Sequence, residues 1–385
     1  MQPWRATFLV FWLLASCGSR SGLAAIGVDA GSTDTEPALA CELHPVAEPW
    51  IWGSARLNTA SPAVVASGRG FVAVWTHPLV DYSSGRGELI AAALDADGRV
   101  LAETRLLGAD EARAYAPRLY ATPRGLLLTW LEQPHRLPAR GCLRWLDDLG
   151  TPLGPPLCPE ELRGGRLIVD ASAEPVLVAT RRAESPAVWE LSDTGPSHLV
   201  AELPAAPQAL ARDGPDLVWL RWTAEPASSS GALDLVGPTW TRRVASRTPH
   251  SDGGEIRILR SGHARVLWRH AELVVTDVAP TGEVRDVLRW DGTGGLYSWH
   301  PELHVDGRIA FGRDRRHADR ASEIEVIVRT IGLETAERGF AEPGPHGCHP
   351  PGAALGHDRV AVAWVGATPG RSTCIPHFAV LRCPE

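Results

Sequence analysis

A short motif that recurs along the chain most constrains its fold. Each copy contains two short runs of alternating apolar residues joined by a tight turn with glycine or proline. Five copies end at or beside a tryptophan, and two are degenerate. The ends of the copies are Trp75, Trp130, Thr180, Trp219, Trp268, Phe311 and Trp364, at intervals of 39 to 55 residues. Two alternating runs around such a turn predict a β-hairpin, so the sequence predicts seven related hairpins.

A second hairpin follows most of these copies. Clear examples cover residues 88–107, 187–203, 272–290 and 323–340. Four strands in units of about 50 residues resemble the blades of a β-propeller of the WD40 or kelch kind. This resemblance implies an all-β fold: a seven-bladed β-propeller of four-stranded antiparallel blades, with the tryptophans in the wedges between neighbouring blades.

The last unit of the repeat lacks a strand. After Trp364 only one further strand-like run, residues 376–384, precedes the end of the sequence. If the fold is a propeller, residues 40–52 near the start of the chain supply the missing outer strand. Such closure joins the first and last blades and covers an exposed sheet edge.

The first residues have the pattern of an export signal. Arg5 precedes an apolar run from Phe8 to Ala15, which is too short for a bilayer span of roughly 20 residues. The sequence Leu14-Ala15-Ser16-Cys17 resembles the lipobox of bacterial lipoproteins. That resemblance implies cleavage before Cys17, lipidation of Cys17 and, with Gly18 next, an outer-membrane location. The alternative is an ordinary signal peptide with an incidental cysteine.

These features predict three regions. Residues 1–16 form a lipoprotein signal peptide, and residues 17–40 comprise the lipidated cysteine and a flexible tether. The tether is small and polar without periodicity, as expected of a flexible linker. Residues 41–385 form the propeller.

The remaining cysteines are consistent with an exported protein. Without Cys17 the count is even, at six, which favours a disulfide framework. The propeller interpretation brings together three local pairs. They are Cys41 with Cys383 at the closing blade, Cys142 with Cys158 across one hairpin, and Cys348 with Cys374 in loops that share a face.

Propellers usually bind ligands on the face where loops link successive blades and link second to third strands. Aromatic, histidine, arginine and carboxylate side chains gather in these loops, and they suit a glycan, a peptide or an anionic group. The alternative without a binding function is that these loops carry polar and charged residues for solubility alone. The candidate binding-face residues are His77, Asp81, Tyr82, Tyr115, His135, Arg136, Tyr297, Trp299, His300, Arg313, Arg315 and His317.

Several function classes are disfavoured. A net charge of −7 leaves no basic face for nucleic acid, and the sequence has no G-x-S-x-G nucleophile elbow. The histidines beside Cys348 do not complete a zinc ligand set. We therefore expect a monomer that needs no cofactor or metal and has no catalytic residues. Its expected role is binding or scaffolding of a protein or glycan at the bacterial cell envelope. A hydrolase of extracellular carbohydrate with paired carboxylates, or a purely structural envelope component, is the alternative.

Overall fold

The computed structural model describes most of the chain from Ala38 onward, within one unit, Pro37–Glu385. No helix in this described part has the length and apolar character needed to cross a bilayer. The described residues are 38–51, 62–78, 87–107, 113–133, 139–163, 165–180, 185–225, 230–249, 254–259, 261–269, 272–290, 295–297, 301–304, 306–315, 323–331, 335–343, 347–367 and 374–384.

Each of the seven predicted hairpins forms an antiparallel pair. Gly70 shows why a glycine lies in such a turn: its φ is +146°, and a Cβ there would lie 2.2 Å from the carbonyl oxygen of Leu94. The pairs are β3 (Ala63–Ser67) with β4 (Gly70–Pro78), β7 (Arg113–Thr122) with β8 (Gly125–Gln133), β10 (Leu167–Asp170) with β11 (Leu177–Thr180), β14 (Ala209–Asp213) with β15 (Asp216–Ala224), β18 (Gly254–Ile258) with β19 (Ala264–Arg269), β23 (Glu302–Leu303) with β24 (Arg308–Arg315), and β27 (Gly347–Leu355) with β28 (Val360–Ala367).

The four predicted second hairpins are also present, and a fifth accompanies them. The pairs are β5 (Gly87–Leu94) with β6 (Val100–Leu107), β12 (Ala187–Ser192) with β13 (Gly195–Glu202), β16 (Ser230–Val236) with β17 (Thr241–Pro249), β20 (Leu273–Val278) with β21 (Val284–Trp290), and β25 (Glu323–Thr330) with β26 (Thr335–Pro343). Beside β9 (Arg140–Leu146) lies an irregular segment, held by bridges from Leu143 to Leu157 and from Leu146 to Pro152. The 3₁₀-helix η2 (Glu160–Leu162) follows it.

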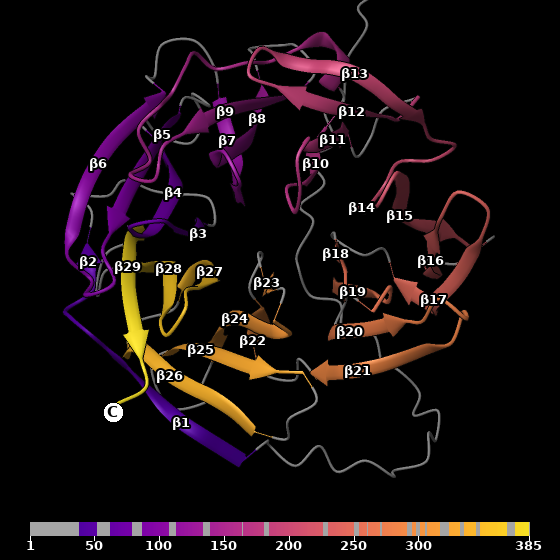
Figure 1. The fold of residues 1–385 in the computed structure, drawn as a ribbon. Coiled ribbons are helices and arrows are strands. Elements are labelled where there is room, and N and C mark those ends of the chain that lie inside the picture. Colours follow the sequence, from indigo (N-terminus) through magenta and orange to yellow (C-terminus); the bar gives the residue numbers. More distant parts are fainter. Residues whose placement is uncertain are drawn as a thin grey trace, which may run out of the picture. The chain divides into compact units, whose positions relative to one another are not determined.

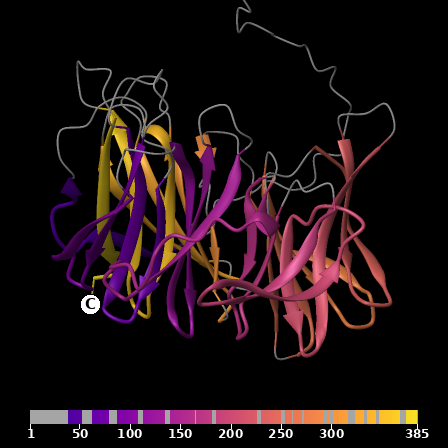
Figure 2. The same ribbon diagram turned by 90° about the horizontal axis from the view of Figure 1, so that it is seen from above.

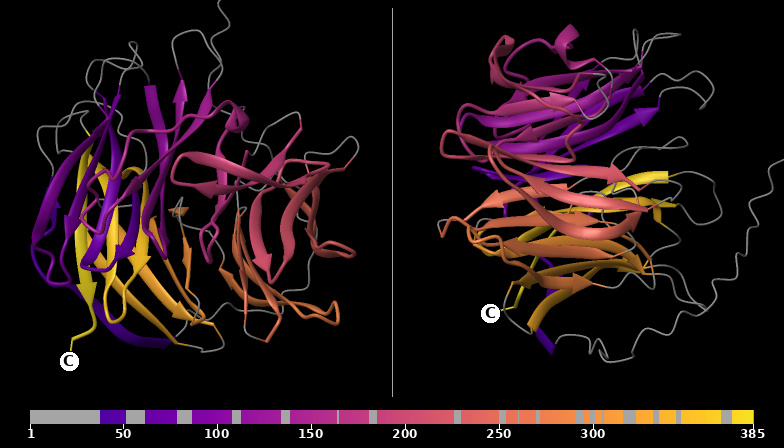
Figure 3. Two further views of the ribbon diagram at one scale, coloured as in Figure 1. Left: turned by 45° about the horizontal axis from the view of Figure 1, so that its top comes forward. Right: turned by 90° about the vertical axis from the view of Figure 1, so that its right-hand side faces the viewer.

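The strands form an all-β, propeller-like arrangement. Three sheets have four strands each, β10–β13, β14–β17 and β18–β21, and the remaining strands belong to larger sheets joined by short cross-pairings. One of these includes β22 (Gly295–Tyr297), which pairs with β24. The sheets surround a common axis, with the first strand of each repeat innermost (Figure 1). Seen from the side, the strands run between two faces (Figures 2 and 3).

The start of the described chain pairs with its end, as the sequence predicts. His44 and Pro45 of β1 (Ala38–Pro45) pair antiparallel with β29 (Cys374–Arg382), and β2 (Trp50–Ile51) pairs with the same strand. A pairing that the sequence did not reveal precedes these contacts. Ala38–Leu43 runs parallel to β26, so β1 joins two sheets and begins three residues before the predicted boundary at residue 41. Without β1, the edge of β26 would expose unpaired backbone N–H and C=O groups, and these groups pair with Ala38–Leu43.

The apolar core is divided among the interfaces between sheets. Trp75 shares an apolar cluster with Phe378, Trp219 with Leu177, and Trp268 with Leu235, and in each case the two residues belong to neighbouring sheets. The five repeat tryptophans are at most 4% exposed. The predicted role of tryptophan as a wedge between sheets is therefore confirmed, and burial of such large apolar surfaces stabilises the ring.

Candidate functional site

The first strands of the repeats surround a cavity of about 180 Å³ near the axis of the unit. Residues of β3, β7, β10, β14, β18, β23 and β27 line it. Its walls combine apolar side chains with charged ones. The charged lining residues are Arg118, Asp170, Glu255, Arg257, Arg269 and Glu302.

The carboxylate of Asp170, at the end of β10, accepts hydrogen bonds from backbone N–H groups of Arg212 and Ser172. Its Oδ2 accepts a hydrogen bond of 2.9 Å from the backbone N–H of Arg212 in β14. Its Oδ1 accepts hydrogen bonds from the N–H and hydroxyl of Ser172, at 3.0 and 2.5 Å. The side chain is only 4% exposed. Asp170 therefore fastens one inner strand to the next.

Glu255, in β18, makes a similar contact with the next sheet. Its Oε2 lies 3.3 Å from the backbone nitrogen of Leu303, which donates to it, and its Oε1 lies 2.5 Å from Nη2 of Arg257. Arg257 in turn donates from Nε to the carbonyl oxygen of Leu303 at 3.2 Å. Burial raises the pKa of Glu255, and the positive charge of Arg257 is the largest opposing effect.

Glu302, in β23, repeats the contact one sheet further on. Its Oε2 accepts a hydrogen bond of 2.6 Å from the backbone N–H of Leu355 in β27. Burial raises the pKa of Glu302 to about 7; the hydrogen bond from Leu355 opposes the shift, and the charge of Glu255 adds to it. This carboxyl group therefore changes its protonation near neutral pH.

Sequence reasoning did not identify these residues. It allowed paired carboxylates only in the hydrolase alternative and assigned no residues to them. The available signal was an acidic residue within or at the end of the first strand of a repeat, as at Asp170, Glu255 and Glu302. Their partners are backbone groups on another repeat, and the sequence pattern alone does not show such contacts.

Most of the predicted binding face lies outside the part that the structure describes. Tyr115, near the start of β7, is half-buried, and its side chain is the one described among the candidates. Backbone pairing places Tyr297 opposite Arg313, and Gly295 opposite Arg315, where β22 meets the end of β24. His77 lies near the end of β4. The side chains of His77, Tyr297, Arg313 and Arg315 lie outside the described part. The remaining candidates lie outside it altogether: Asp81, Tyr82, His135, Arg136, Trp299, His300 and His317.

Two of the three predicted disulfides are confirmed. Cys41 bonds to Cys383 and Cys142 bonds to Cys158, with Cα–Cα distances of 5.8 and 4.2 Å. The third pair stays a prediction, because the side chains of Cys348, at the start of β27, and Cys374, at the start of β29, lie outside the described part.

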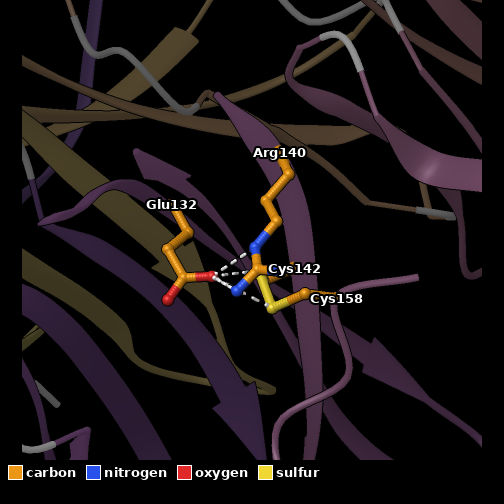
Figure 4. Close-up of a disulfide and its surroundings, with 4 residues drawn as sticks. All are labelled: Glu132, Arg140, Cys142 and Cys158. Carbon is orange, nitrogen blue, oxygen red and sulfur yellow. Dashed lines mark hydrogen bonds and ion pairs between the residues drawn. A yellow bond between two sulfur atoms is a disulfide. The ribbon is translucent and has the colours of Figure 1, made fainter. Parts of the chain in front are cut away.

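The Cys142–Cys158 disulfide lies beside a partly buried ion pair (Figure 4). The Oε2 atom of Glu132 lies 3.3 and 3.4 Å from the two sulfurs, and 2.7 Å from both Nε and Nη2 of Arg140. Within the described ranges, Glu132 and the two cysteines form the one cluster with metal-ligand spacing. Because the sulfurs are bonded to each other, neither is a thiolate that could bind a metal ion.

Comparisons with known proteins are informative for the fold alone. No protein-family model and no curated protein matches the sequence. A protein of unknown function from Dyadobacter fermentans DSM 18053 is similar in structure, with a TM-score of 0.52 and 13% identity over 89% of this chain and 99% of its own. An acylaminoacyl peptidase from Pyrococcus horikoshii gives a TM-score of 0.43 and 9% identity over 85% of this chain and 50% of its own. The strand arrangement makes the chain an all-β, propeller-like protein, and the two disulfides among its described residues indicate an oxidising, extracytoplasmic environment.

Proposed function

We propose that this chain is an exported, lipid-anchored, seven-bladed β-propeller that binds a protein or a glycan at the bacterial cell envelope without catalysis. The blade count is supported by the seven first hairpins and by seven apolar clusters, each formed by residues of two neighbouring repeats. The last blade consists of β27–β29 with β1 and β2 as its outer strand.

The lipid anchor is supported by the motif around Cys17 and by evidence for export. Leu14-Ala15-Ser16-Cys17 matches the lipobox pattern, and the two disulfides fit a compartment outside the cytoplasm. The acylated cysteine would attach the protein to the outer membrane, because several acyl chains hold a protein stably where one does not. The partner would bind at the loop-rich face, which carries the candidate residues around Tyr115 and Arg313.

One observation supports binding over hydrolysis. The carboxylates that line the cavity accept hydrogen bonds from the backbone of neighbouring inner strands: Asp170 from Arg212, Glu255 from Leu303, and Glu302 from Leu355. A glycoside hydrolase needs two carboxyl groups free to act as acid and as base or nucleophile. Here the carboxylates maintain the ring, and the cavity is smaller than the 300–1,000 Å³ usual for ligand pockets.

A specific observation keeps the hydrolase as the second candidate. The pKa of Glu302 is about 7 and that of Glu255 is raised, and raised pKa values are typical of general acids. Both residues line one cavity, together with Trp268.

Binding at the loop-rich face is tested with the full chain in its native membranes. Cross-linking followed by mass spectrometry should recover a defined partner or glycan with the natural protein, and lose it with a Tyr115→Ala, Arg313→Ala double variant. Arg99→Ala is the matched control, because Arg99 is exposed in the β5–β6 turn, on the opposite face. Equal recovery by all three proteins contradicts the proposed face.

Catalysis is tested separately with aryl glycosides and polysaccharides. We expect no turnover above a buffer blank. Turnover that is lost in both Glu302→Gln and Glu255→Gln, with the fold intact by circular dichroism, replaces the binding proposal with the hydrolase. The anchor is tested by metabolic labelling with a palmitate analogue, which should label the natural protein and not Cys17→Ser.

A further inference from the structure

One guanidinium in the central cavity has a buried nitrogen that lacks a hydrogen-bond acceptor among the described residues. Nε of Arg118 is buried, and no hydrogen bond to it exists among the described residues. Glu255 forms its ion pair with Arg257, on the same cavity. The charge of Arg118 also acts on Glu255, but no ion pair of Arg118 within contact distance is present in that part of the chain. A buried charged donor without an acceptor reduces the stability of the folded protein. A ligand or an ion that accepts its hydrogen bond would remove this penalty.

The backbone before Arg118 is distorted in a way that directs this side chain. The pairing of β7 with β8 shifts register between Tyr115 and Arg118, so β7 contains one extra residue there. Within the bulge, Ala116 has a φ of +52° and is the one non-glycine with positive φ in the described part. Bulges re-aim side chains beside functional sites, and strained residues persist where the strain serves a role.

The charges around the cavity favour a ligand with a single negative charge. Glu255 forms an ion pair with Arg257 and also lies in the field of Arg118, and the carboxylate of Asp170 accepts three hydrogen bonds from Arg212 and Ser172. A doubly charged phosphate would face the carboxyl groups of Asp170, Glu255 and Glu302, and Nε of Arg118 is the one buried guanidinium nitrogen of the lining without an acceptor among the described residues. A planar carboxylate instead matches the two-pronged geometry of a guanidinium.

The apolar part of the lining favours an organic body on that anion. Ile168, Leu210, Ile256 and Trp268 line the cavity beside the charged groups. The indole N–H of Trp268 already donates to Oγ1 of Thr276 at 3.1 Å, so its ring presents an apolar surface. A volume of about 180 Å³ limits the ligand to a small molecule.

From these observations we infer that the central cavity binds a small organic monocarboxylate. Its carboxylate pairs with the guanidinium of Arg118, and its apolar body lies against Ile256 and Trp268. This site is distinct from the proposed partner site on the loop-rich face. Either site can be wrong without affecting the other, because the two are tested with different ligands and different variants.

The test is isothermal titration of the full chain with sodium butyrate and sodium benzoate. Butyramide, which has the shape of butyrate without the charge, and sodium phosphate serve as comparison ligands. We expect saturable binding of at least one carboxylate and none of butyramide or phosphate. Arg118→Gln should weaken carboxylate binding at least tenfold, while Arg99→Gln, an exposed arginine in the β5–β6 turn, should bind as the natural protein does.

A second measurement needs no variant and covers the case in which Arg118→Gln does not fold. Phenylglyoxal modifies arginine side chains, and peptide mass spectrometry reports the rate at each position. Saturating butyrate or benzoate should slow modification of Arg118 and leave that of Arg99 unchanged. No binding of either carboxylate, equal binding of butyramide, stronger binding of phosphate, or unchanged modification of Arg118 each overturns the inference.

Discussion

The carboxylate of Glu302 accepts a hydrogen bond of 2.6 Å from the backbone N–H of Leu355. The two residues belong to the first strands of successive repeats, β23 and β27, so one side chain links two inner strands. In the same way, Glu255 accepts a hydrogen bond from the backbone N–H of Leu303, and Asp170 accepts one from that of Arg212. The ring is therefore held by polar contacts around its axis as well as by the tryptophan-filled interfaces farther out.

The raised pKa of Glu302 predicts a pH-dependent stability. The pKa of Glu302 is about 7 in the folded protein, and the ordinary pKa of a glutamate side chain is 4.5. The folded state therefore binds this proton more tightly than the unfolded state does. The contribution of Glu302 is therefore present below pH 4.5 and is lost as the pH rises to about 7. Glu302→Gln keeps an acceptor for Leu355 and cannot ionise. At pH 8 it should raise the free energy of unfolding by on the order of 1–3 kcal/mol.

Urea unfolding at pH 5 and pH 8 checks this prediction. The gain should be large at pH 8 and small at pH 5. Glu161→Gln, at an exposed position in η2, should change little at either pH. A Glu302→Gln variant that is equally destabilised at both pH values contradicts the argument.

His377 gives the opposite pH dependence. Its ring stacks on Trp364 with centroids 5.0 Å apart and planes at 15°, and burial lowers the pKa of His377 to about 4. Its stabilising contribution is present above the ordinary pKa of 6.5 and is lost as the pH falls toward 4, because the unfolded chain binds the proton more tightly. His377→Phe, which keeps an aromatic ring on Trp364, should lose less stability between pH 6.5 and pH 4.

Thermal unfolding measured across this pH interval tests the role of His377. The matched control is His198→Phe at an exposed position of β13, which should follow the natural protein. Identical pH profiles for the natural protein and His377→Phe are the result that rejects this explanation.

Asp170 should matter more for stability than an exposed acid does. Asp170→Ala leaves the N–H groups of Arg212 and Ser172 without their acceptor, and we expect a loss of about 2–3 kcal/mol. Asp170→Asn retains an amide oxygen and should lose less. Asp216→Ala, exposed at the start of β15, is the control. Chemical denaturation ranks the variants, and equal stability of Asp170→Ala and Asp216→Ala contradicts a fastening role.

The two disulfides should differ in their effect on stability. Cys41–Cys383 spans 342 residues and Cys142–Cys158 spans 16. Because a crosslink restricts the unfolded chain more when its loop is longer, replacing the first pair by serines should cost about 5 kcal/mol and the second about 3 kcal/mol. Guanidinium unfolding of the two double variants measures both values. A larger loss from the shorter loop is inconsistent with this account.

The local pattern of the sequence determined most of the fold. Alternating apolar runs around glycine turns identified the seven first hairpins, and the same alternation identified the second ones, because side chains of a strand point alternately to its two faces. The recurring tryptophans marked the buried interfaces. Cysteine positions, read within the propeller resemblance, identified the Cys41–Cys383 and Cys142–Cys158 bonds and the pairing of the start of the chain with β29.

Only the tertiary structure decided what lies at the axis. The acceptor roles of Asp170, Glu255 and Glu302, the place of Arg118 on a cavity lined by several repeats, and the parallel pairing of Ala38–Leu43 with β26 all depend on segments far apart in the sequence. Their geometry depends on how the sheets are rotated and shifted against one another, which local alternation does not encode. The pKa of an acid follows from that geometry, because the burial and the neighbouring charges that move it exist only once the ring has formed.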